Sequence, residues 1–263
     1  MSFIVNPYVY AVAGCADADA NAFLTATGIT NPTISGAICT LVTSLKAQGI
    51  WSKLDAIYPM VGGTATTHMY NLKNPANTNA AFRLSFVGGW THSANGALPN
   101  GTNAYADTFY NINIQTNVNN ACFGAYIRTN NTSGLQVYGS FSSPSTRVFN
   151  NLSNGNIQIA NIGQIFYTPN PSTGLFFSRR TSSTFNESYR NGVSLGNTTA
   201  LTTSLPVFNF YFGALNNTGT ATFYSLHQIA FGVLGGSASM TNTDASNLYS
   251  TIQTFQTTLG RQV

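Results

Sequence analysis

The feature that most constrains the fold is a long series of short apolar segments with period-two alternation, which begins near residue 80. Turn-forming clusters separate these segments, including Asn95-Gly96, Asn100-Gly101 and Asn154-Gly155. Period-two alternation places one face of a strand on a core, and many short strands joined by short turns are typical of two-sheet proteins. The sequence therefore predicts a mainly β fold, an antiparallel two-sheet sandwich.

The alternation sets the bounds of the expected strands. They span Ala81–Val87, Asp107–Gln115, Ala121–Arg128, Leu135–Phe141, Ile157–Tyr167, Gly174–Arg180, Ser183–Tyr189, Val193–Leu195, Val207–Phe212 and Phe223–Val233. Asn191-Gly192 separates two of these strands, and both residue types tolerate the positive φ of a type I′ turn. We therefore expect a two-residue hairpin turn at this point.

Helical patterns flank the β region. Residues 17–26 are rich in alanine and begin with acidic side chains, which the positive end of a helix dipole favours. Asn31 is a good N-cap for a second helix, with Pro32 in its first turn. The last expected helix spans Thr243–Leu259, with the threonine as its N-cap. The sandwich should therefore carry N-terminal helices and a C-terminal helix.

Charged residues make up only 6% of the chain, against about a quarter in an average protein. Ten Lys+Arg and six Asp+Glu leave a net charge of +4. The hydrophobic share of 43% is ordinary, which argues against a disordered chain. The basic residues form no stripe for nucleic acid, and no apolar run approaches the roughly 18 residues of a membrane span. We therefore expect no nucleic-acid partner and no membrane span.

The cysteines lack the spacing of a metal site. We interpret Cys15, Cys39 and Cys122 as buried small apolar side chains or spare thiols. The residues ahead of Cys15 resemble a lipoprotein cleavage box. However, no Lys or Arg precedes Lys46, and Asn6-Pro7 interrupts the apolar stretch, so we expect no export signal.

Residues 1–14 are apolar and β-prone, without a helical period. They fit either a first strand of the core or an arm that pairs with another chain, because an unpaired apolar strand is a template for strand addition. The candidate contact residues of such an arm are Phe3, Ile4, Val5, Tyr8 and Tyr10. We expect residues 1–60 to be an arm and helical attachment segment, and residues 61–263 to be the sandwich domain.

Three pieces occur in an informative order in the C-terminal half. They are the hairpin Tyr189–Val193, the aromatic strand Phe208–Gly213 and the closing stretch Leu226–Phe231, and a helix follows Met240–Asp244. Together they resemble the concanavalin A-like (laminin G-like) jelly-roll family over roughly residues 80–263. The resemblance implies that the sandwich is a jelly roll.

A second set of segments is more specific. It comprises Gly49–Pro59, Val61–Thr64, Asn71–Pro75, Phe82–Phe86 and Gly88–Ser93. This block, roughly residues 45–127, is similar to a domain of virion proteins of tailed bacteriophages. The resemblance implies a structural, decoration, fibre or tail role and a place in the virion. It carries no catalytic residues.

The same jelly-roll family includes glycoside hydrolases, whose reaction needs two carboxyl groups about 5–9.5 Å apart. Asp107 and Glu187 are the acids left after the helix starts and the N-terminal segment are assigned, and they lie far apart in sequence. His68, His92 and His227 are not accompanied by a Gly-x-Ser-x-Gly nucleophile motif. We therefore expect no catalytic residues and no enzyme.

Ligand sites have weak support in the sequence. Asp107 with Asn111 and Asn113 offers few oxygens for calcium, and no nucleotide-binding motif is present, so we expect no metal and no cofactor. Glycan binding needs aromatic faces beside amides and arginine, although most aromatic residues should fill the core. The candidate glycan-binding residues are Trp90, His92, Tyr110, Tyr126, Arg128 and Tyr138.

The leading hypothesis is a non-enzymatic bacteriophage virion structural protein, acting through assembly contacts as a capsid decoration, head fibre or tail component. A surface with few charges lowers the electrostatic cost of packing identical copies together. Its partners would be other virion proteins and further copies of this chain. The alternative is a glycan-binding module for adhesion to a host or to mucus, and a glycoside hydrolase ranks third.

Overall fold

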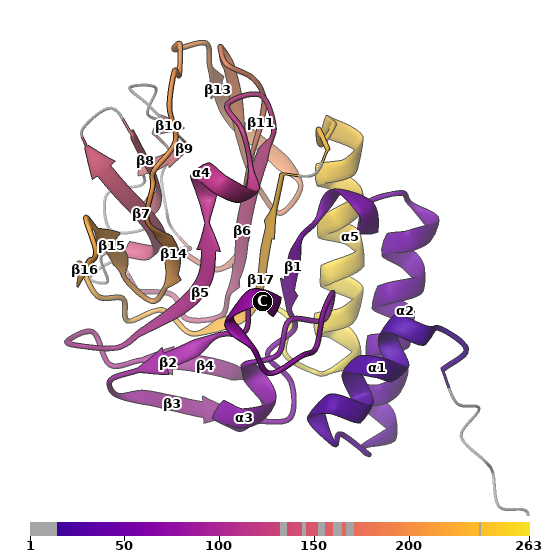
Figure 1. Ribbon diagram of the computed structural model, residues 1–263. Helices are drawn as coiled ribbons and strands as arrows, with labels where there is room; N and C mark the ends of the chain where they lie inside the picture. Colours follow the sequence, from indigo (N-terminus) through magenta and orange to yellow (C-terminus); the bar gives the residue numbers. More distant parts are fainter. Residues whose placement is uncertain are drawn as a thin grey trace, which may run out of the picture.

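The protein has three layers: two β-sheets packed face to face, and a layer of helices against one of them (Figure 1). The computed structural model describes residues 15–131, 136–143, 146–151, 156–159, 165–166, 171–236 and 238–263. The predicted mainly β two-sheet sandwich with N-terminal and C-terminal helices is confirmed. The arm predicted within residues 1–14 lies outside the described residues.

The sheet next to the helices, named here the covered sheet, has the strand order β13-β12-β11-β6-β17-β4-β3, with β1 also paired to β17. Its strands are β1 (Ala56–Tyr58), β3 (Trp90–Ser93), β4 (Gly96–Pro99), β6 (Ala121–Ile127), β11 (Gly174–Ser182), β12 (Phe185–Arg190), β13 (Val193–Thr198) and β17 (Ile229–Gly235). β1 precedes residue 60, so the segment ahead of the predicted domain boundary contributes a strand to this sheet.

The other sheet, named here the open sheet, has the order β10-β9-β8-β7-β14-β5-β2, with β15 and β16 attached. Its strands are β2 (Ser85–Val87), β5 (Tyr105–Asn111), β7 (Gln136–Ser143), β8 (Thr146–Asn151), β9 (Asn156–Ile159), β10 (Ile165–Phe166), β14 (Asn209–Phe212), β15 (Leu215–Asn217) and β16 (Thr220–Thr222). Its pairings are antiparallel except that β15 runs parallel to β7.

Aromatic side chains fill the space between the sheets. Phe123 of the covered sheet stacks on Phe210 of the open sheet, with 5.2 Å between ring centroids. Phe212 meets Tyr58 edge to face at 5.8 Å. Period-two alternation produces this core, because Ala106 and its even-numbered neighbours in β5 point inward.

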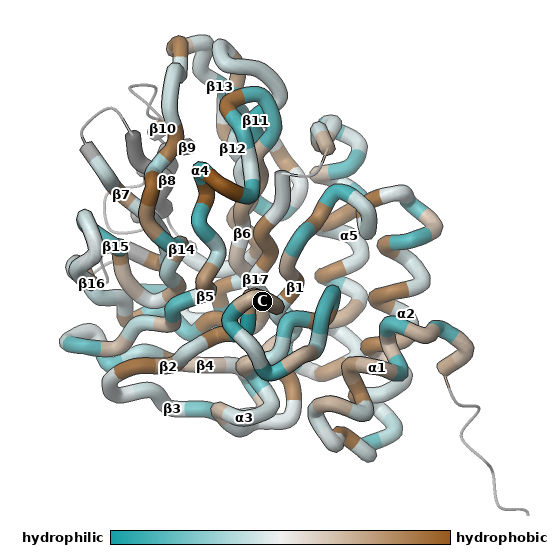
Figure 2. The backbone as a smooth tube through the Cα atoms, viewed as in Figure 1, coloured by the Kyte–Doolittle hydropathy of each residue, from teal (hydrophilic) through white to brown (hydrophobic). Residues whose placement is uncertain are grey.

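The main helices are α1 (Ala18–Thr27), α2 (Pro32–Ala47) and α5 (Asn242–Thr258), and the short ones are α3 (Ala65–His68), α4 (Ile112–Gln115), η1 (Trp51–Lys53) and η2 (Asn79–Ala81). The main helices share a second hydrophobic cluster with the outer face of the covered sheet, where Phe231 of β17 meets Phe255 of α5 at 5.7 Å. Hydrophobic residues recur along β17 and these helices (brown in Figure 2). None of the helices in the described part is long and apolar enough to cross a bilayer.

Local signals predicted several elements correctly. Asn31 caps α2 by accepting the N–H of Thr33 and of Ile34, as its place before Pro32 indicated. Asn191 has a φ of 51° and Gly192 a φ of 74°, which is the predicted type I′ pattern.

Two predicted boundaries were wrong. The N-cap of α5 is Thr241, because Asp244 reaches back from the third helical position to accept the Thr241 N–H at 2.6 Å. The strand predicted to reach Gln115 ends at Asn111, whose side chain accepts the N–H of Asn113 and starts α4.

The interpretation of Cys15 and Cys39 as spare thiols was also wrong. These two residues form a disulfide between the segment before α1 and the middle of α2, with 5.6 Å between their Cα atoms. Spacing along the chain did not reveal the pairing, because the helical hairpin of α1 and α2 creates it. Cys122 is a free, buried cysteine, and burial raises the pKa of its thiol.

Arg261 joins three parts of the fold although it is only 1% exposed. Its guanidinium donates to the backbone carbonyls of Pro59, Met60 and Ala230 at 2.6–2.9 Å, and to Oε1 of Gln256 at 2.5 Å. Burial lowers its pKa to about 9, and the nearby cation Arg128 contributes. The residue therefore links the end of β1 and the strand β17 to the end of α5.

Candidate functional site

The two outer faces of the sandwich differ. Helices α1, α2 and α5 lie against the covered sheet, whereas no helix of the described residues lies over the open sheet (Figure 1). Strand pairing places Ser85, Asp107, Tyr211 and Gly139 in one row across β2, β5, β14 and β7. Because the adjacent residue Ala106 points into the core, this row faces outward.

Two tyrosines form the centre of the outer face, of which Tyr105 is partly exposed and Tyr211 is only 7% exposed. The rings of Tyr105 and Tyr211 stack with 4.7 Å between centroids and 22° between planes. Together with Ser85, Asp107 and Asn209 they form what we name the tyrosine platform. It combines aromatic rings with a carboxylate, an amide and a hydroxyl group on one surface.

The carboxylate of Asp107 is held in place from two directions. Its Oδ1 accepts the Phe109 N–H at 2.8 Å and the Asn209 Nδ2–H at 3.1 Å. Partial burial raises the pKa of Asp107, and these two hydrogen bonds oppose the rise without cancelling it. Burial, followed by the charge of Asp107, raises the pKa of Tyr211 to about 12.

The backbone beside the platform is irregular. Phe109 has a φ of 55°, and the register of β5 against β14 shifts between the Tyr211–Asp107 pair and the Asn209–Asn111 pair. An aromatic residue at positive φ is strained, and bulges recur next to functional sites. The guanidinium of Arg83 lies 5.7 Å from the Phe109 ring. Because the Phe109 N–H donates to Asp107, the bulge lies directly beside the platform.

Three of the predicted glycan-binding residues are core residues instead. Tyr110, Tyr126 and Tyr138 are at most 1% exposed, so none has a ring face available to a sugar. Tyr138 packs between the sheets 5.3 Å from Phe210. Tyr126 lies beneath α5 and donates its hydroxyl to Gln253 at 2.8 Å.

The other three predicted residues have mixed outcomes. Arg128 donates to the backbone carbonyl of Arg261 at 2.6 Å, so its guanidinium is already bound to the C-terminal segment. Trp90 and His92 are brought together, with 6.2 Å between their rings. The indole N–H of Trp90 reaches the carbonyl of Tyr105 at 3.2 Å, which connects this pair to the platform. A glycan-binding role for these two residues remains a prediction.

The histidines are paired or satisfied. Nδ1 of His68 and Nδ1 of His92 are 2.9 Å apart, so one ring donates to the other. Burial, with smaller contributions from His92 and Arg261, lowers the pKa of His68 to about 3. His227 is buried between the Ser225 hydroxyl and the carbonyl of Asn131.

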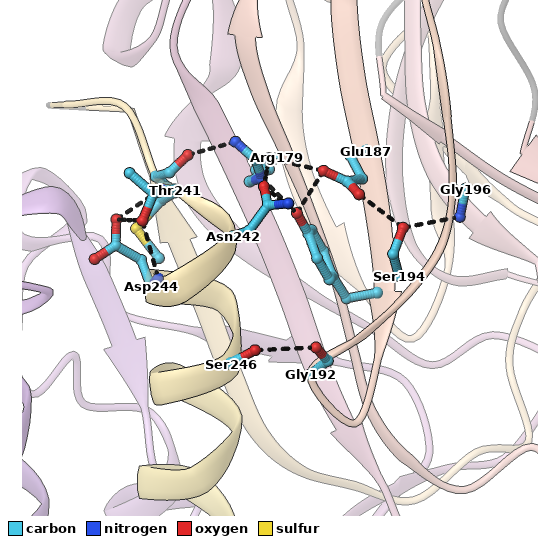
Figure 3. A network of polar contacts seen from close by, with 11 residues as sticks. Arg179, Glu187, Gly192, Ser194, Gly196, Thr241, Asn242, Asp244 and Ser246 are labelled. Carbon is cyan, nitrogen blue, oxygen red and sulfur yellow. Dashed lines mark hydrogen bonds and ion pairs between the residues drawn. The ribbon is translucent and has the colours of Figure 1, made fainter.

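Glu187 belongs to a buried network that attaches α5 to the covered sheet (Figure 3). Its carboxylate accepts hydrogen bonds from Arg179, Tyr189 and Ser194 at 2.6–2.7 Å. Burial acts to raise the pKa of Glu187, but these three donors outweigh it and lower the pKa. The same Arg179 contacts the Asn242 side chain at the start of α5.

Glu187 and Asp107 therefore lie on opposite outer faces of the sandwich. Both sheets separate them, and packed sheets are about 10 Å apart. The two carboxyl groups do not face one cleft, which a glycosidase pair requires. Within the described ranges, no three His, Cys, Asp or Glu side chains gather to hold a metal ion.

Tyr105, Asn209 and Tyr211 were not among the predicted site residues. A signal for them was present, because Tyr105, Asp107 and Phe109 alternate with core residues along β5 and must share a face. The partner strand β14 was expected, but its register was not. Register decides which aromatic residue of β14 lies beside Asp107.

The chain is similar to solved structures of toxin binding domains. A structure described as "Cell entry of botulinum neurotoxin type C is dependent upon interaction with two ganglioside molecules" aligns with a TM-score of 0.55 and 11% identity, over 79% of this chain and 53% of that one. The binding domain of botulinum neurotoxin DC, in complex with rat synaptotagmin II, aligns with 0.53 and 11%, over 78% and 53%. The serotype D binding domain aligns with 0.51 and 12%, over 77% and 52%.

These likenesses show the fold, a β-sandwich, and the chain spans about half the length of the structures that it matches. No known protein family matches the sequence. No curated protein matches it either.

Proposed function

We propose that this protein is a glycan-binding adhesion module that holds a sugar on the tyrosine platform. The observation that carries the proposal is the outward row that holds Asp107 and Tyr211, with the partly exposed ring of Tyr105 stacked on Tyr211. An aromatic face attracts the polarised C–H groups of a sugar ring, while carboxylate and amide groups hydrogen-bond its hydroxyls. Aromatic residues with a few positioned polar groups are typical of small-ligand sites.

The comparisons support this proposal through the shared sandwich. For one of the similar structures, cell entry of botulinum neurotoxin type C is described as dependent upon interaction with two ganglioside molecules. That description is of the toxin, and this chain spans 53% of the structure that it matches. The proposal for this chain rests on its own side chains.

The test is a glycan array probed with the full chain. We expect binding to at least one glycan, and a loss of about tenfold or more in Asp107→Asn and Tyr211→Ala, since a hydrogen bond to a charged group contributes about 1.5–3 kcal/mol. Tyr249→Ala, on α5 at the covered sheet, is the matched control and should bind normally. Equal binding by all three variants would overturn the proposal.

A protonation experiment sharpens the test. Because burial raises the pKa of Asp107, its carboxylate takes up a proton at a higher pH than an ordinary aspartate does. Glycan binding should therefore weaken as pH falls through this raised pKa, and Asp107→Asn should bind with less dependence on pH. Titration calorimetry at several pH values measures both curves.

We keep a virion structural protein, in a capsid decoration, head fibre or tail, as a second candidate. The outer groove between α2 and α5 favours it, because its polar lining consists of neutral side chains such as Thr40, Ser44, Ser250 and Thr254. A neutral helical face can pack against further copies with little charge to desolvate. Light scattering tests this candidate: stable oligomers or co-purifying virion proteins support it, and a monomer at all concentrations contradicts it.

A further inference from the structure

A second recess lies apart from the platform. It is a pocket of about 390 Å³ formed by η1, the start of β1, η2 and the end of α4. The residues that matter for its chemistry are Asp55, Asn71, Lys73, Asn74, Phe82 and Gln115. We name it the Asp55 pocket. Its size falls within the range of about 300–1,000 Å³ that is typical of small-ligand sites.

A buried amide fixes the floor of the pocket. Asn71 is fully buried, and its Oδ1 accepts the N–H of Ile57 at 2.9 Å and that of Lys73 at 3.0 Å. Its Nδ2 donates to the carbonyls of Ala81 at 3.0 Å and Asp55 at 3.3 Å. Four backbone groups are thereby locked together, so the pocket keeps its shape without a ligand.

The anionic wall is anchored from the core. Oδ2 of Asp55 accepts the hydroxyl of Tyr110 at 2.7 Å, and Tyr110 is itself fully buried. The ring of Phe82 packs edge to face on Tyr110, with 5.1 Å between centroids, and also lines the pocket. The pocket therefore presents a positioned carboxylate beside an aromatic ring.

Lys73 forms the cationic wall of the pocket. Nζ of Lys73 donates to the carbonyl of Trp51 at 2.7 Å and lies 4.1 Å from the centroid of the Trp51 ring. An ammonium group has three N–H donors, of which this carbonyl takes one. Burial lowers the pKa of Lys73, while the charges of Asp19 and Asp55 oppose that change.

We propose that the Asp55 pocket binds a neutral, hydroxyl-rich ring of about the size of a hexose. A hydroxyl group can donate to the Asp55 carboxylate and accept from the Lys73 ammonium, and the amides of Asn74 and Gln115 can do both. The ring of Phe82 offers an apolar surface to the sugar carbons. This inference rests on the proposed function for its ligand class, and it assigns a separate site.

Charge balance selects against ionic ligands. The charges of Asp55 and Lys73 cancel, so the pocket remains without net charge when a neutral ligand binds. A carboxylated sugar would oppose the anchored Asp55, and an amine would oppose Lys73. Neutral hexoses and N-acetylhexosamines should therefore bind more tightly than uronic or sialic acids.

Trp51 provides a direct readout. The chain has two tryptophans, so Trp90→Phe leaves Trp51, in contact with Lys73, as the single tryptophan. We would titrate this variant with glucose, galactose, mannose, N-acetylglucosamine and glucuronate. A saturable fluorescence change with a neutral sugar, weaker or absent with glucuronate, is the expected result.

Matched variants in the same background decide whether the signal comes from the pocket. Asp55→Asn keeps an acceptor for Tyr110, and it should weaken binding about tenfold or more, as should Lys73→Gln. Lys46→Gln is the control, because Lys46 also lies near Trp51, at 5.2 Å, but does not line the pocket. No saturable change at about 100 mM sugar, or equal binding in all variants, would overturn the inference.

Failure of this inference is distinguishable from failure of the proposed function. In the parent chain, Tyr211→Ala should weaken array binding about tenfold or more, and in the single-tryptophan protein it should leave the Trp51 signal intact. An array signal that survives Asp55→Asn while Trp51 never responds supports the platform and rejects the pocket. The reverse pattern supports the pocket and rejects the platform.

Discussion

At the residue scale, the buried His68, in contact with the half-buried His92, makes stability depend on pH. His68 is fully buried beside His92 and has a pKa of about 3 in the folded protein, against 6.5 as the ordinary value. The unfolded chain therefore binds a proton more readily than the folded protein does between these values. The stability that neutral His68 provides is complete above about pH 6.5 and is lost as pH falls toward 3.

We expect the free energy of unfolding to fall by up to about 1.4 kcal/mol per pH unit below pH 6 because of this residue. His68→Gln should be less stable at pH 7, and its disadvantage should shrink at pH 4.5, since glutamine does not titrate. Urea unfolding at both pH values measures the difference. A constant gap between the two proteins would contradict this account.

The roles of some residues could be predicted from the sequence, and those of others could not. Asn31, Asn191 and Gly192 were predictable because their roles depend on the backbone of immediate neighbours. Tyr110 and Tyr126 were misjudged, since burial depends on strands and helices that lie far away in the chain. Asp55 was assigned only to the N-terminal segment, because Tyr110, its partner, is 55 residues away.

At the element scale, the hairpin of α1 and α2 depends on the Cys15–Cys39 disulfide. The bridge closes a loop of 24 residues in sequence separation, and a loop of this length restricts the unfolded chain by about 3 kcal/mol. Cys39→Ser should lower the free energy of unfolding by about that amount, as measured by denaturant unfolding.

The control for the disulfide is a reducing agent. It should destabilise the parent protein and leave Cys39→Ser unchanged. An equal effect of the reductant on both proteins would show that the bridge does not support the hairpin.

The elements show where local patterns stop being informative. β6 was predicted within one residue because its apolar run is long and turns flank it. β1, β3 and β4 were not expected, since they are only three or four residues long and depend on pairing with other strands. The start of α4 at Ile112 follows from the capping side chain of Asn111, which the alternating pattern concealed.

At the scale of the whole molecule, Arg261 connects segments that lie about 200 residues apart in the chain. Arg261→Met should lower the free energy of unfolding by about 3–5 kcal/mol, because buried carbonyls lose a charged partner. Arg83→Met, which removes a surface bond to Asn79, is the control and should change stability by less than about 1 kcal/mol. Thermal unfolding of both variants checks this, and similar melting temperatures would contradict it.

The overall architecture was more predictable than the site. Turn spacing and alternation sufficed for a two-sheet sandwich with terminal helices, because these are properties of the chain as a whole. The tyrosine platform required the register of β14 against β5, and the Asp55 pocket required η1, η2 and the end of α4 to meet around one recess. Alternation along β5 shows that Tyr105 and Asp107 share a face, but which residues of other segments lie beside them cannot be read from the sequence.

Because the main helices α1, α2 and α5 all lie against the covered sheet, the described part of the protein has a helical side and a sheet side. Molecules seated next to one another on their helical sides would all turn the stacked rings of Tyr105 and Tyr211 the same way. Weak contacts of single molecules would then combine across such a layer, since each contact formed raises the effective concentration of the ligand at the neighbouring platforms.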